Sequence, residues 1–126
     1  MARENISTEN APKPQGAYSQ AVKANGFVFV SGQVPVDMST GIITAEGVHK
    51  ETKVIFDNIS AILEAAGTST EKTVKLTIYL NDIGNIKFVN EVMNERFGEN
   101  LPARSVVEVS RLPKDIGIEI DAVAEA

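Results

Sequence analysis

The chain has 126 residues, of which 43% are hydrophobic and 23% charged, and its formal net charge at pH 7 is −5. This balance predicts one globular domain, residues 1–126, and no run approaches the roughly 20 apolar residues of a membrane span. The acidic charge argues against nucleic-acid binding, which depends on clustered Lys and Arg. Because the polar N-terminus is unlike a signal peptide, we expect a cytoplasmic protein with no membrane partner.

Cysteine is absent from the sequence, and histidine occurs once, as His49. These counts exclude disulfides, thiolate nucleophiles and a zinc site built from thiolate and imidazole. A Ser-His-Asp triad would need His49. That residue begins a helical pattern among charged neighbours, so we interpret it as a solvated surface histidine and expect no metal site.

The first third of the chain predicts a hairpin between two loops. The stretch up to Gly16 is punctuated by prolines and predicts an extended loop. Two strand-like segments follow, Ala17–Ala24 and Phe27–Val30. Asn25-Gly26 between them favours a type I′ turn, in which both central residues have positive φ, so the segments predict a β-hairpin. Turn-forming residues from Pro35 to Gly41 predict a connecting loop.

The rest of the chain predicts two helices and three strands. Apolar residues at helical spacing predict a long helix over about Glu46–Ala66, ended by Gly67. β-branched and apolar residues predict a central strand over Val74–Leu80. A second helix follows, and its predicted buried face consists of Ile86, Val89, Met93 and Phe97. Strands over Ala103–Val109 and Gly117–Ala124 complete the order ββαβαββ.

Two helices can cover only one face of such a sheet. The segment Phe27–Val30 nevertheless has apolar side chains directed to both faces, and so does the pair Val106 and Val107. Another copy of the chain is the simplest cover for the second face. We therefore predict a homo-oligomer in which the sheets pack on one another.

Arg104 and Glu119 are the two charged residues whose chemistry is most suited to a small-molecule site. The planar guanidinium of Arg104 matches a carboxylate, although its spacing alone is typical of a solvated arginine. Glu119 alternates with apolar neighbours, so it faces either solvent, as Asp121 does, or a cleft in which it could activate water. If the last two strands form a hairpin, Arg104 lies nearer Val123 than Glu119. A shared site would then need a neighbouring chain.

Polar residues gather near one end of the predicted hairpin. Tyr18–Gln20 lie in its first strand and Ser31–Gln33 end its second, and Gly32 would let the backbone approach a ligand closely. Asn90 is a polar residue beside the buried face of the second helix. Residues of these kinds serve as structural caps more often than as ligand contacts.

Several ordered motifs between about residues 10 and 122 closely resemble the RidA/YjgF family of reactive-intermediate deaminases. The motifs are Gly16–Ala21, Ser31–Pro35, Asn58-Ile59 with Ala65–Gly67, Pro102–Ser105, and Leu112–Asp115 with Ile118–Ile120. The resemblance implies a chorismate-mutase-like α+β fold, in which two helices cover one face of a mixed sheet. It also implies a homotrimer with three active sites in the clefts between subunits.

The resemblance further implies an enzyme that hydrolyses 2-imino acids and their enamine tautomers to 2-oxo acids and ammonia. Its substrates, such as 2-iminobutanoate and 2-iminopropanoate, are released by pyridoxal-phosphate dehydratases. By motif, Arg104 would hold the substrate carboxylate and Glu119 would position or activate the attacking water. The remaining substrate-binding positions are Tyr18, Ser31, Gly32 and Asn90. No cofactor is expected, because a protonated imine is already a strong electrophile.

Three positions depart from the family pattern. Ala17 stands where proline is usual, Met93 where an aromatic residue is common, and Val106 where many members have cysteine. Two other functions stay open. One is an endoribonuclease or translation inhibitor, which the acidic charge disfavours. The other is a non-enzymatic regulatory trimer that senses small acids through Arg104.

Overall fold

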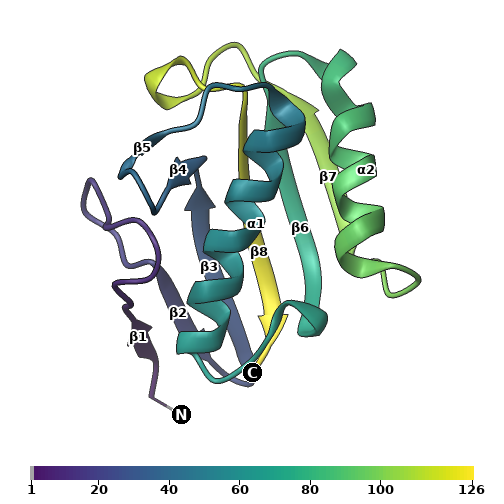
Figure 1. The fold of residues 1–126 in the computed structure, drawn as a ribbon. Helices are drawn as coiled ribbons and strands as arrows, with labels where there is room; N and C mark the ends of the chain where they lie inside the picture. The colour runs from purple at the N-terminus through teal and green to yellow at the C-terminus, as the bar shows by residue number, and fades with distance from the viewer. Residues whose placement is uncertain (1) are drawn as a thin grey trace.

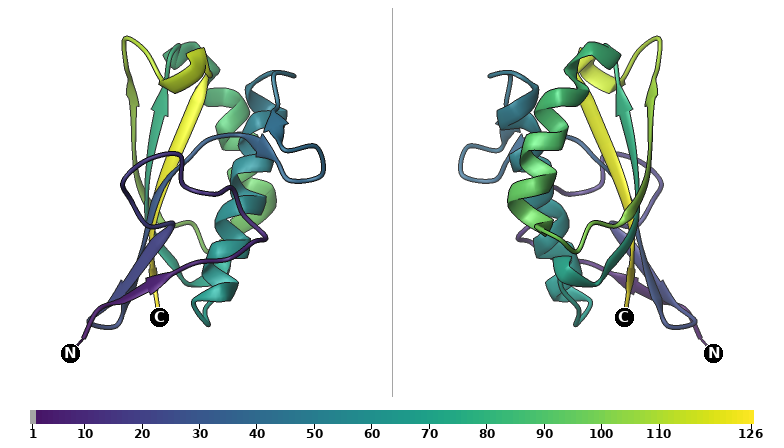
Figure 2. Two further views of the ribbon diagram at one scale, coloured as in Figure 1. Left: turned by 90° about the vertical axis from the view of Figure 1, so that its left-hand side faces the viewer. Right: turned by 90° about the vertical axis from the view of Figure 1, so that its right-hand side faces the viewer.

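The computed structural model describes residues 2–126, and it has two layers, a mixed six-stranded sheet and two helices on one face of that sheet (Figures 1 and 2). The strands are β1 (Glu4–Ile6), β2 (Ala21–Ala24), β3 (Phe27–Gln33), β4 (Val36–Asp37), β5 (Ile42–Ile43), β6 (Thr73–Leu80), β7 (Ala103–Glu108) and β8 (Ile118–Glu125). The α-helices are α1 (Val48–Ala65) and α2 (Ile86–Phe97), and the 3-10 turns are η1 (Thr70–Lys72), η2 (Ile83–Asn85) and η3 (Pro113–Asp115). The predicted α+β class and the order ββαβαββ, here β2-β3-α1-β6-α2-β7-β8, are confirmed.

The strands of the large sheet lie in the order β1-β2-β3-β8-β6-β7. β6 and β7 are parallel, and the other neighbours are antiparallel. β6 therefore separates the last two strands, and Leu76 pairs with Arg104 on one side and with Ala122 on the other. The last two strands do not form a hairpin, because the connection from β7 to β8 crosses over β6.

Three local predictions in the first half of the chain are wrong. β1 forms inside the predicted N-terminal loop, because Ile6 is buried and the edge of β2 accepts a partner strand. β2 begins at Ala21 rather than Ala17, because the residues before it leave the ladder. The predicted loop over residues 35–41 contains β4, which pairs with β5 in a small separate hairpin.

The predicted turn between β2 and β3 is confirmed. Asn25 has φ 54° and Gly26 has φ 85°, the positive angles that a type I′ turn requires. Ala24 pairs with Phe27 directly across it. This turn fixes which side chains of β3 face the helices.

The core lies between the helices and one face of the sheet. Its fully buried side chains alternate along the strands and follow the inner stripe of each helix. The largest of them are Phe56, Ile55, Ile59, Ile62, Leu63, Leu76, Ile78, Leu80, Ile118 and Ile120. Phe56 of α1 meets Phe97 of α2 edge to face, with ring centroids 5.7 Å apart. All four predicted apolar residues of α2 contribute to this layer.

The opposite face of the sheet, called the open face here, is covered by neither helix (Figure 2). It carries Phe27, Phe29 and Val107, with 40%, 48% and 42% of their surface exposed. Such a patch of large apolar side chains is typical of a protein interface. The expectation that the helices leave one apolar sheet face bare is therefore confirmed for the single chain.

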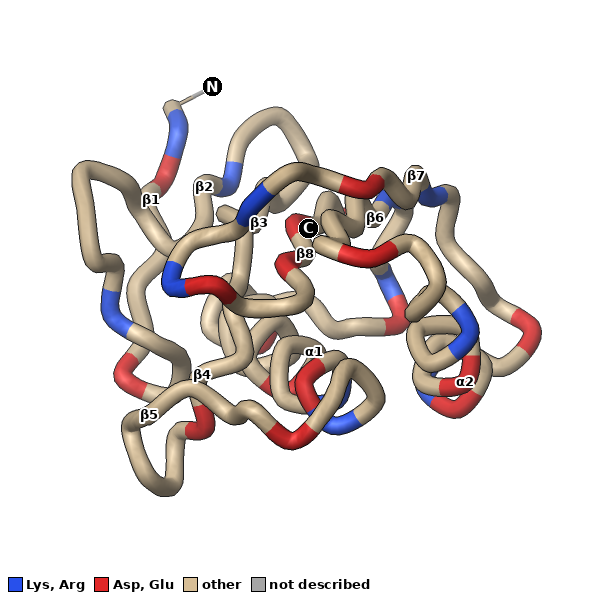
Figure 3. The backbone as a smooth tube through the Cα atoms, turned by 90° about the horizontal axis from the view of Figure 1, so that it is seen from above, with Lys and Arg blue, Asp and Glu red and all other residues tan. Residues whose placement is uncertain are grey.

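Charges of both signs are interspersed along the backbone (Figure 3). Two ion pairs tie α1 to α2, Arg96 with Asp57 at 2.8 Å and Lys53 with Glu95 at 3.7 Å. His49 lies at the surface, where its Nε2 is 3.5 Å from a carboxylate oxygen of Glu91. No helix in the described part of the chain is long and apolar enough to cross a membrane.

The buried face of β8 makes a direct prediction about stability. Ile120→Ala should lower the free energy of unfolding by about 2–5 kcal/mol, because it leaves a cavity in a fully packed layer. The matched change Ile42→Ala, at a side chain 67% exposed, should shift it by about 0.5 kcal/mol or less. Denaturant unfolding measures both, and equal losses would contradict this assignment of the core.

Candidate functional site

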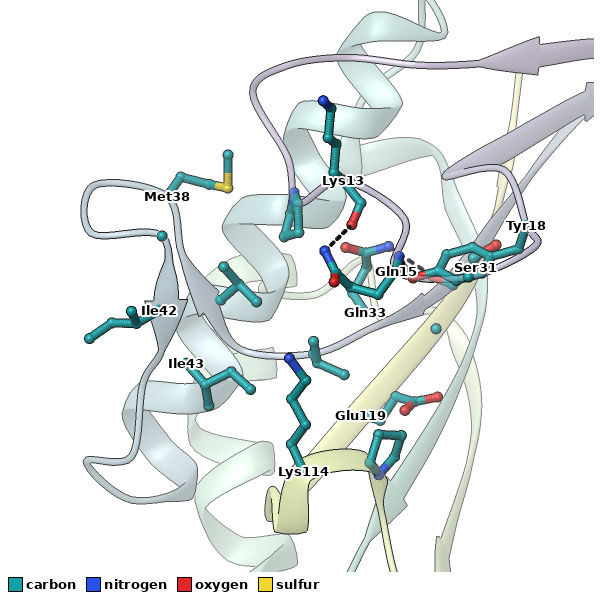
Figure 4. A pocket seen from close by; sticks show the side chains of 17 residues that line it. Lys13, Gln15, Tyr18, Ser31, Gln33, Met38, Ile42, Ile43, Lys114 and Glu119 are labelled. Atoms are coloured by element: carbon teal, nitrogen blue, oxygen red, sulfur yellow. Dashed lines mark hydrogen bonds between the residues drawn. The ribbon is translucent and has the colours of Figure 1, made fainter.

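A cavity of about 870 Å³ opens where β3 ends and β8 begins (Figure 4). Its walls are the loop of residues 12–18, the end of β3, the η3 turn and the β4–β5 hairpin. Four of the site residues expected from the sequence line this cavity, namely Tyr18, Ser31, Gly32 and Glu119. We call it the Glu119 pocket.

Glu119 lies against the backbone of Gly32. A β-bulge makes this possible: Val30 pairs with Ala122 but Gln33 pairs with Ile120, so two residues of β3 oppose one residue of β8. A Cβ atom added to Gly32 would overlap with Oε2 of Glu119. Gly32 is therefore needed for space, and the close approach expected for a ligand is made here by the carboxylate itself.

The environment of Glu119 favours its protonated form more than water does. Its neighbours Ile118 and Ile120 are fully buried on the helix side, whereas Glu119 is half-buried on the open face. Burial raises the pKa of the Glu119 carboxyl above its ordinary value, and the nearby carboxylate of Asp121 raises it further. A carboxylate with a raised pKa binds a proton more readily, which suits a general base.

Asp121 shares the open face with Glu119 but has a different partner. The Tyr79 hydroxyl donates a hydrogen bond to its Oδ2 at 3.2 Å. Burial and the negative charge of Asp121 raise the pKa of Tyr79, so the hydroxyl keeps its proton and remains a donor. Glu119 accepts no hydrogen bond from the described residues, so its oxygens can accept one from water or a ligand.

Tyr18 and Ser31 both line the pocket, and the hydroxyl of each makes a hydrogen bond with the backbone. The Tyr18 hydroxyl accepts a hydrogen bond from the backbone N–H of Gln15 at 3.2 Å, which leaves its own proton for a ligand. The Ser31 hydroxyl donates to the carbonyl oxygen of Ser19 at 2.6 Å. With its proton used in this way, Ser31 can only accept hydrogen bonds from a ligand.

Gln20 has a structural role and does not line the pocket. Its buried side-chain amide donates to three backbone carbonyl oxygens of the preceding loop, and its oxygen accepts the N–H of Thr8 at 2.7 Å. These bonds replace strand pairing before Ala21, which explains the late start of β2. They also fix the loop that carries Tyr18.

Arg104 lies in a second, smaller pocket of about 300 Å³ between β7 and α2. Its register partner Leu76 is fully buried on the helix side, so Arg104 also faces α2 and not the open face. Asn90 lines the same pocket, called the Arg104 pocket here. The Nη1 atom of Arg104 is 3.2 Å from Sδ of Met93, which is a weak acceptor.

Among the described residues, Arg104 has no carboxylate partner, although it is only partly exposed to solvent. A guanidinium offers five N–H donors, and a thioether satisfies one of them weakly. The remaining donors are available to a ligand with two acceptor oxygens, such as a carboxylate.

The single chain thus divides the proposed residues into two groups. Arg104 and Asn90 belong to one pocket, and the four residues around Glu119 belong to the other. Arg104 and Glu119 face opposite sides of the sheet, and β6 lies between the strands that carry them. One chain does not bring Arg104 to Glu119.

The structure adds residues that sequence reasoning missed. Lys114 and the hairpin residues Met38, Ile42 and Ile43 line the Glu119 pocket. The sequence feature that could have indicated these hairpin residues is the presence of three large apolar side chains, Met38, Ile42 and Ile43, in a segment that is otherwise typical of a polar loop. No group of three or more His, Asp or Glu side chains within residues 2–126 is placed to hold a metal ion.

Known proteins match this chain over nearly its whole length. The family model described as Endoribonuclease L-PSP matches residues 8–126. A RutC family protein of Pyrococcus abyssi is 53% identical, and the alignment covers 98% of each chain. The 2-iminobutanoate/2-iminopropanoate deaminase of Salmonella typhimurium is 44% identical over 94% of each chain. A solved structure from Yersinia pestis, of the conserved Rid protein family, has a TM-score of 0.95 at 41% identity, covering 99% of this chain and 100% of that one.

The electrostatics of the Glu119 pocket predict a measurable coupling. Asp121→Asn should lower the pKa of Glu119 toward the ordinary carboxyl range, because it removes the nearby negative charge that helps to raise it. Carboxyl-detected NMR titration measures this value. Glu64→Gln, on the exposed side of α1, is the matched control and should leave it unchanged. An identical Glu119 titration in the Asp121 variant and the unmodified protein would refute the coupling.

Proposed function

Because the chain belongs to the RidA/YjgF family, we propose that it hydrolyses 2-imino acids and their enamine tautomers to 2-oxo acids and ammonia. The substrates would include 2-iminobutanoate and 2-iminopropanoate, the compounds in the name of the relative from Salmonella typhimurium. The observation that carries the proposal is the partly buried Arg104, which has no acidic partner among the described residues, in a chain whose Glu119 pocket holds a carboxyl group with a raised pKa.

Arg104 would bind the substrate through its carboxylate. Its guanidinium can donate two parallel hydrogen bonds to the two oxygens, which fixes the orientation of a planar imino acid as well as holding it. Asn90 lines the same pocket and offers an amide for the remaining oxygen or the imine nitrogen. Orienting the substrate is the main contribution that the protein must make to catalysis, because the carbon of a protonated imine is already a strong electrophile.

Glu119 would act on the water. Its carboxylate accepts a proton as the water oxygen bonds to the imine carbon, and the resulting carbinolamine releases ammonia as the carbonyl forms. The carboxylate form is required for the first step, so activity should fall as the pH falls through the raised pKa of Glu119. Tyr18 lies at the same pocket with a hydroxyl proton that can stabilise the developing alcohol oxygen.

A complete site requires both pockets, and a second copy of the chain would supply the missing half. The open face has the exposed Phe27, Phe29 and Val107 needed to hold such a copy. If sheets packed on one another about a threefold axis, the Arg104 pocket of one chain could meet the Glu119 pocket of the next. We therefore propose a homotrimer with a site at each of its interfaces.

The three departures from the family pattern are compatible with this chemistry. Met93 contacts Arg104 through its sulfur and leaves most guanidinium donors open. Val106 packs against the core on the helix side, and the steps proposed here use no thiol. Ala17 is exposed in the loop before Tyr18. The physiological source of the imine would be a pyridoxal-phosphate dehydratase.

A ribonuclease is the second candidate, because the matching family model is described as an endoribonuclease. The net charge of −5 and the interspersed charges in Figure 3 do not favour a phosphate backbone as ligand. Retention of the purified protein on single-stranded RNA at physiological salt would support this candidate. Saturable binding of 2-oxo acids without turnover of imines would instead support a regulatory role.

Arg104→Ala tests the proposed function. In an assay that couples a threonine dehydratase to a chemical trap for free imine, the unmodified protein should speed the release of 2-oxobutanoate. The variant should lose roughly 100-fold or more in kcat/KM, because each charge-assisted hydrogen bond contributes about 1.5–3 kcal/mol. Arg104→Lys should recover part of this loss.

Arg96→Ala is the matched control for this experiment. Arg96 lies on α2, pairs with Asp57 and lines neither pocket, so its removal should leave kcat/KM unchanged. Full activity in the Arg104→Ala variant would remove this residue from the mechanism. No acceleration by the unmodified protein with any imino acid would refute the proposed reaction.

A further inference from the structure

The Glu119 pocket is larger than the smallest proposed substrates require. Its volume of about 870 Å³ falls in the upper part of the range of pockets for drug-sized ligands, roughly 300–1,000 Å³. In the single chain, an imino acid with a methyl or ethyl side chain would leave most of that space empty. The space beyond Glu119 therefore needs an explanation of its own.

The additional space leads to the β4–β5 hairpin. Figure 4 shows Met38, Ile42 and Ile43 on the side of the pocket away from Glu119 and Tyr18. Val34 and Val36 also line the cavity. We call this region, bounded by Val34, Val36, Met38, Ile42 and Ile43, the apolar arm.

The β4–β5 hairpin has polar side chains that hold its turn together and apolar side chains that make no such bonds. Asp37 is committed to the turn, since its carboxylate accepts bonds from the N–H and hydroxyl of Ser39 at 2.9 and 2.6 Å. Met38 and Ile42 are 42% and 67% exposed and have no such role. Large apolar side chains that stay exposed beside a cavity indicate a binding surface, because covering them with an apolar group lowers the free energy.

The apolar arm is fixed before any ligand binds. The side-chain amide of Asn58, which is buried in α1, donates to the carbonyl oxygen of Val36 at 2.9 Å. The N–H of Thr44 donates to the carbonyl oxygen of Pro35 at 2.8 Å. A preformed arm loses little conformational entropy on binding, so apolar contact made there contributes directly to affinity.

We propose that the apolar arm binds the substrate side chain, and that the preferred substrates are 2-imino acids with long, unbranched apolar side chains. The inference rests on the proposed function. With the carboxylate at Arg104 of another copy and the imine carbon beside Glu119, the side chain extends along the apolar arm toward Met38 and Ile42. Lys114 also lines the pocket.

A homologous substrate series tests this proposal. An amino-acid oxidase with catalase generates the imines of alanine, 2-aminobutanoate, norvaline and norleucine in the presence of the protein. The kcat/KM value should rise roughly fourfold with each methylene, the gain expected from burying one such group. Equal or falling kcat/KM values along the series would overturn the assignment of the arm.

The double variant Met38→Asn, Ile42→Asn tests the residues. It should reduce the norleucine-to-alanine ratio of kcat/KM at least tenfold, and the exposed positions allow both changes without loss of the fold. Ile83→Asn is the matched control, since Ile83 is exposed to the same 42% as Met38 and lines neither pocket. An unchanged ratio in the double variant would contradict the proposal.

Binding of the unreactive 2-oxo acids distinguishes a failure of the proposed function from a failure of the apolar arm. Calorimetric Kd values for pyruvate through 2-oxohexanoate should fall along the series in the unmodified protein and remain level in the double variant. If no imine is turned over but this binding trend holds, the proposed function fails and the apolar arm stands. Turnover of imines without a trend in either kcat/KM or Kd would reject the arm alone.

Discussion

Two helices cover one face of a six-stranded sheet and leave the other face bare, and the candidate site depends on that asymmetry. Because side chains alternate along a strand, each residue of β7 and β8 belongs to one side only. Arg104 shares the helix side with Leu76, and Glu119 shares the open face with Tyr79. The two charged groups that the proposed chemistry uses are on opposite sides of the sheet, so the proposed site also needs a second copy of the chain.

A second constraint is the bulge in β3. At the bulge, two residues of β3 lie opposite one residue of β8. One of the two is Gly32, which has no side chain, so the Glu119 carboxylate can lie against its backbone. The carboxylate is thereby held in a half-buried position, where burial raises its pKa. Fold and chemistry are linked here, since the same glycine that relieves the crowding also sets the environment of the proposed base.

Much of this architecture can be predicted from the sequence where the cause is local. The Asn25-Gly26 turn, the end of α1 at Gly67 and the buried stripe of α2 each follow from the conformational preference or spacing of neighbouring residues. β1 and β4 could not be predicted in this way, because each is only two or three residues long and is a strand only through its pairing partner.

The same distinction between local and long-range causes applies to the candidate site. Motif resemblance selects Arg104 and Glu119, but their placement on opposite sides depends on β6 lying between β7 and β8. That strand order reflects packing over the whole sheet and leaves no mark in the local pattern. The apolar arm was missed for a related reason, since Met38 and Ile42 become neighbours of the pocket only once the hairpin packs on α1.

The central claim is that Arg104 and Glu119 of different chains form one site, and complementation tests it directly. Arg104→Ala and Glu119→Gln each remove one half of every site, so each variant alone should be inactive. Co-expressed in equal amounts, they should recover roughly a quarter of the unmodified activity, because random assembly places an intact Arg104 beside an intact Glu119 at one interface in four. Mixed assemblies as inactive as the two parent variants would contradict a site shared between chains.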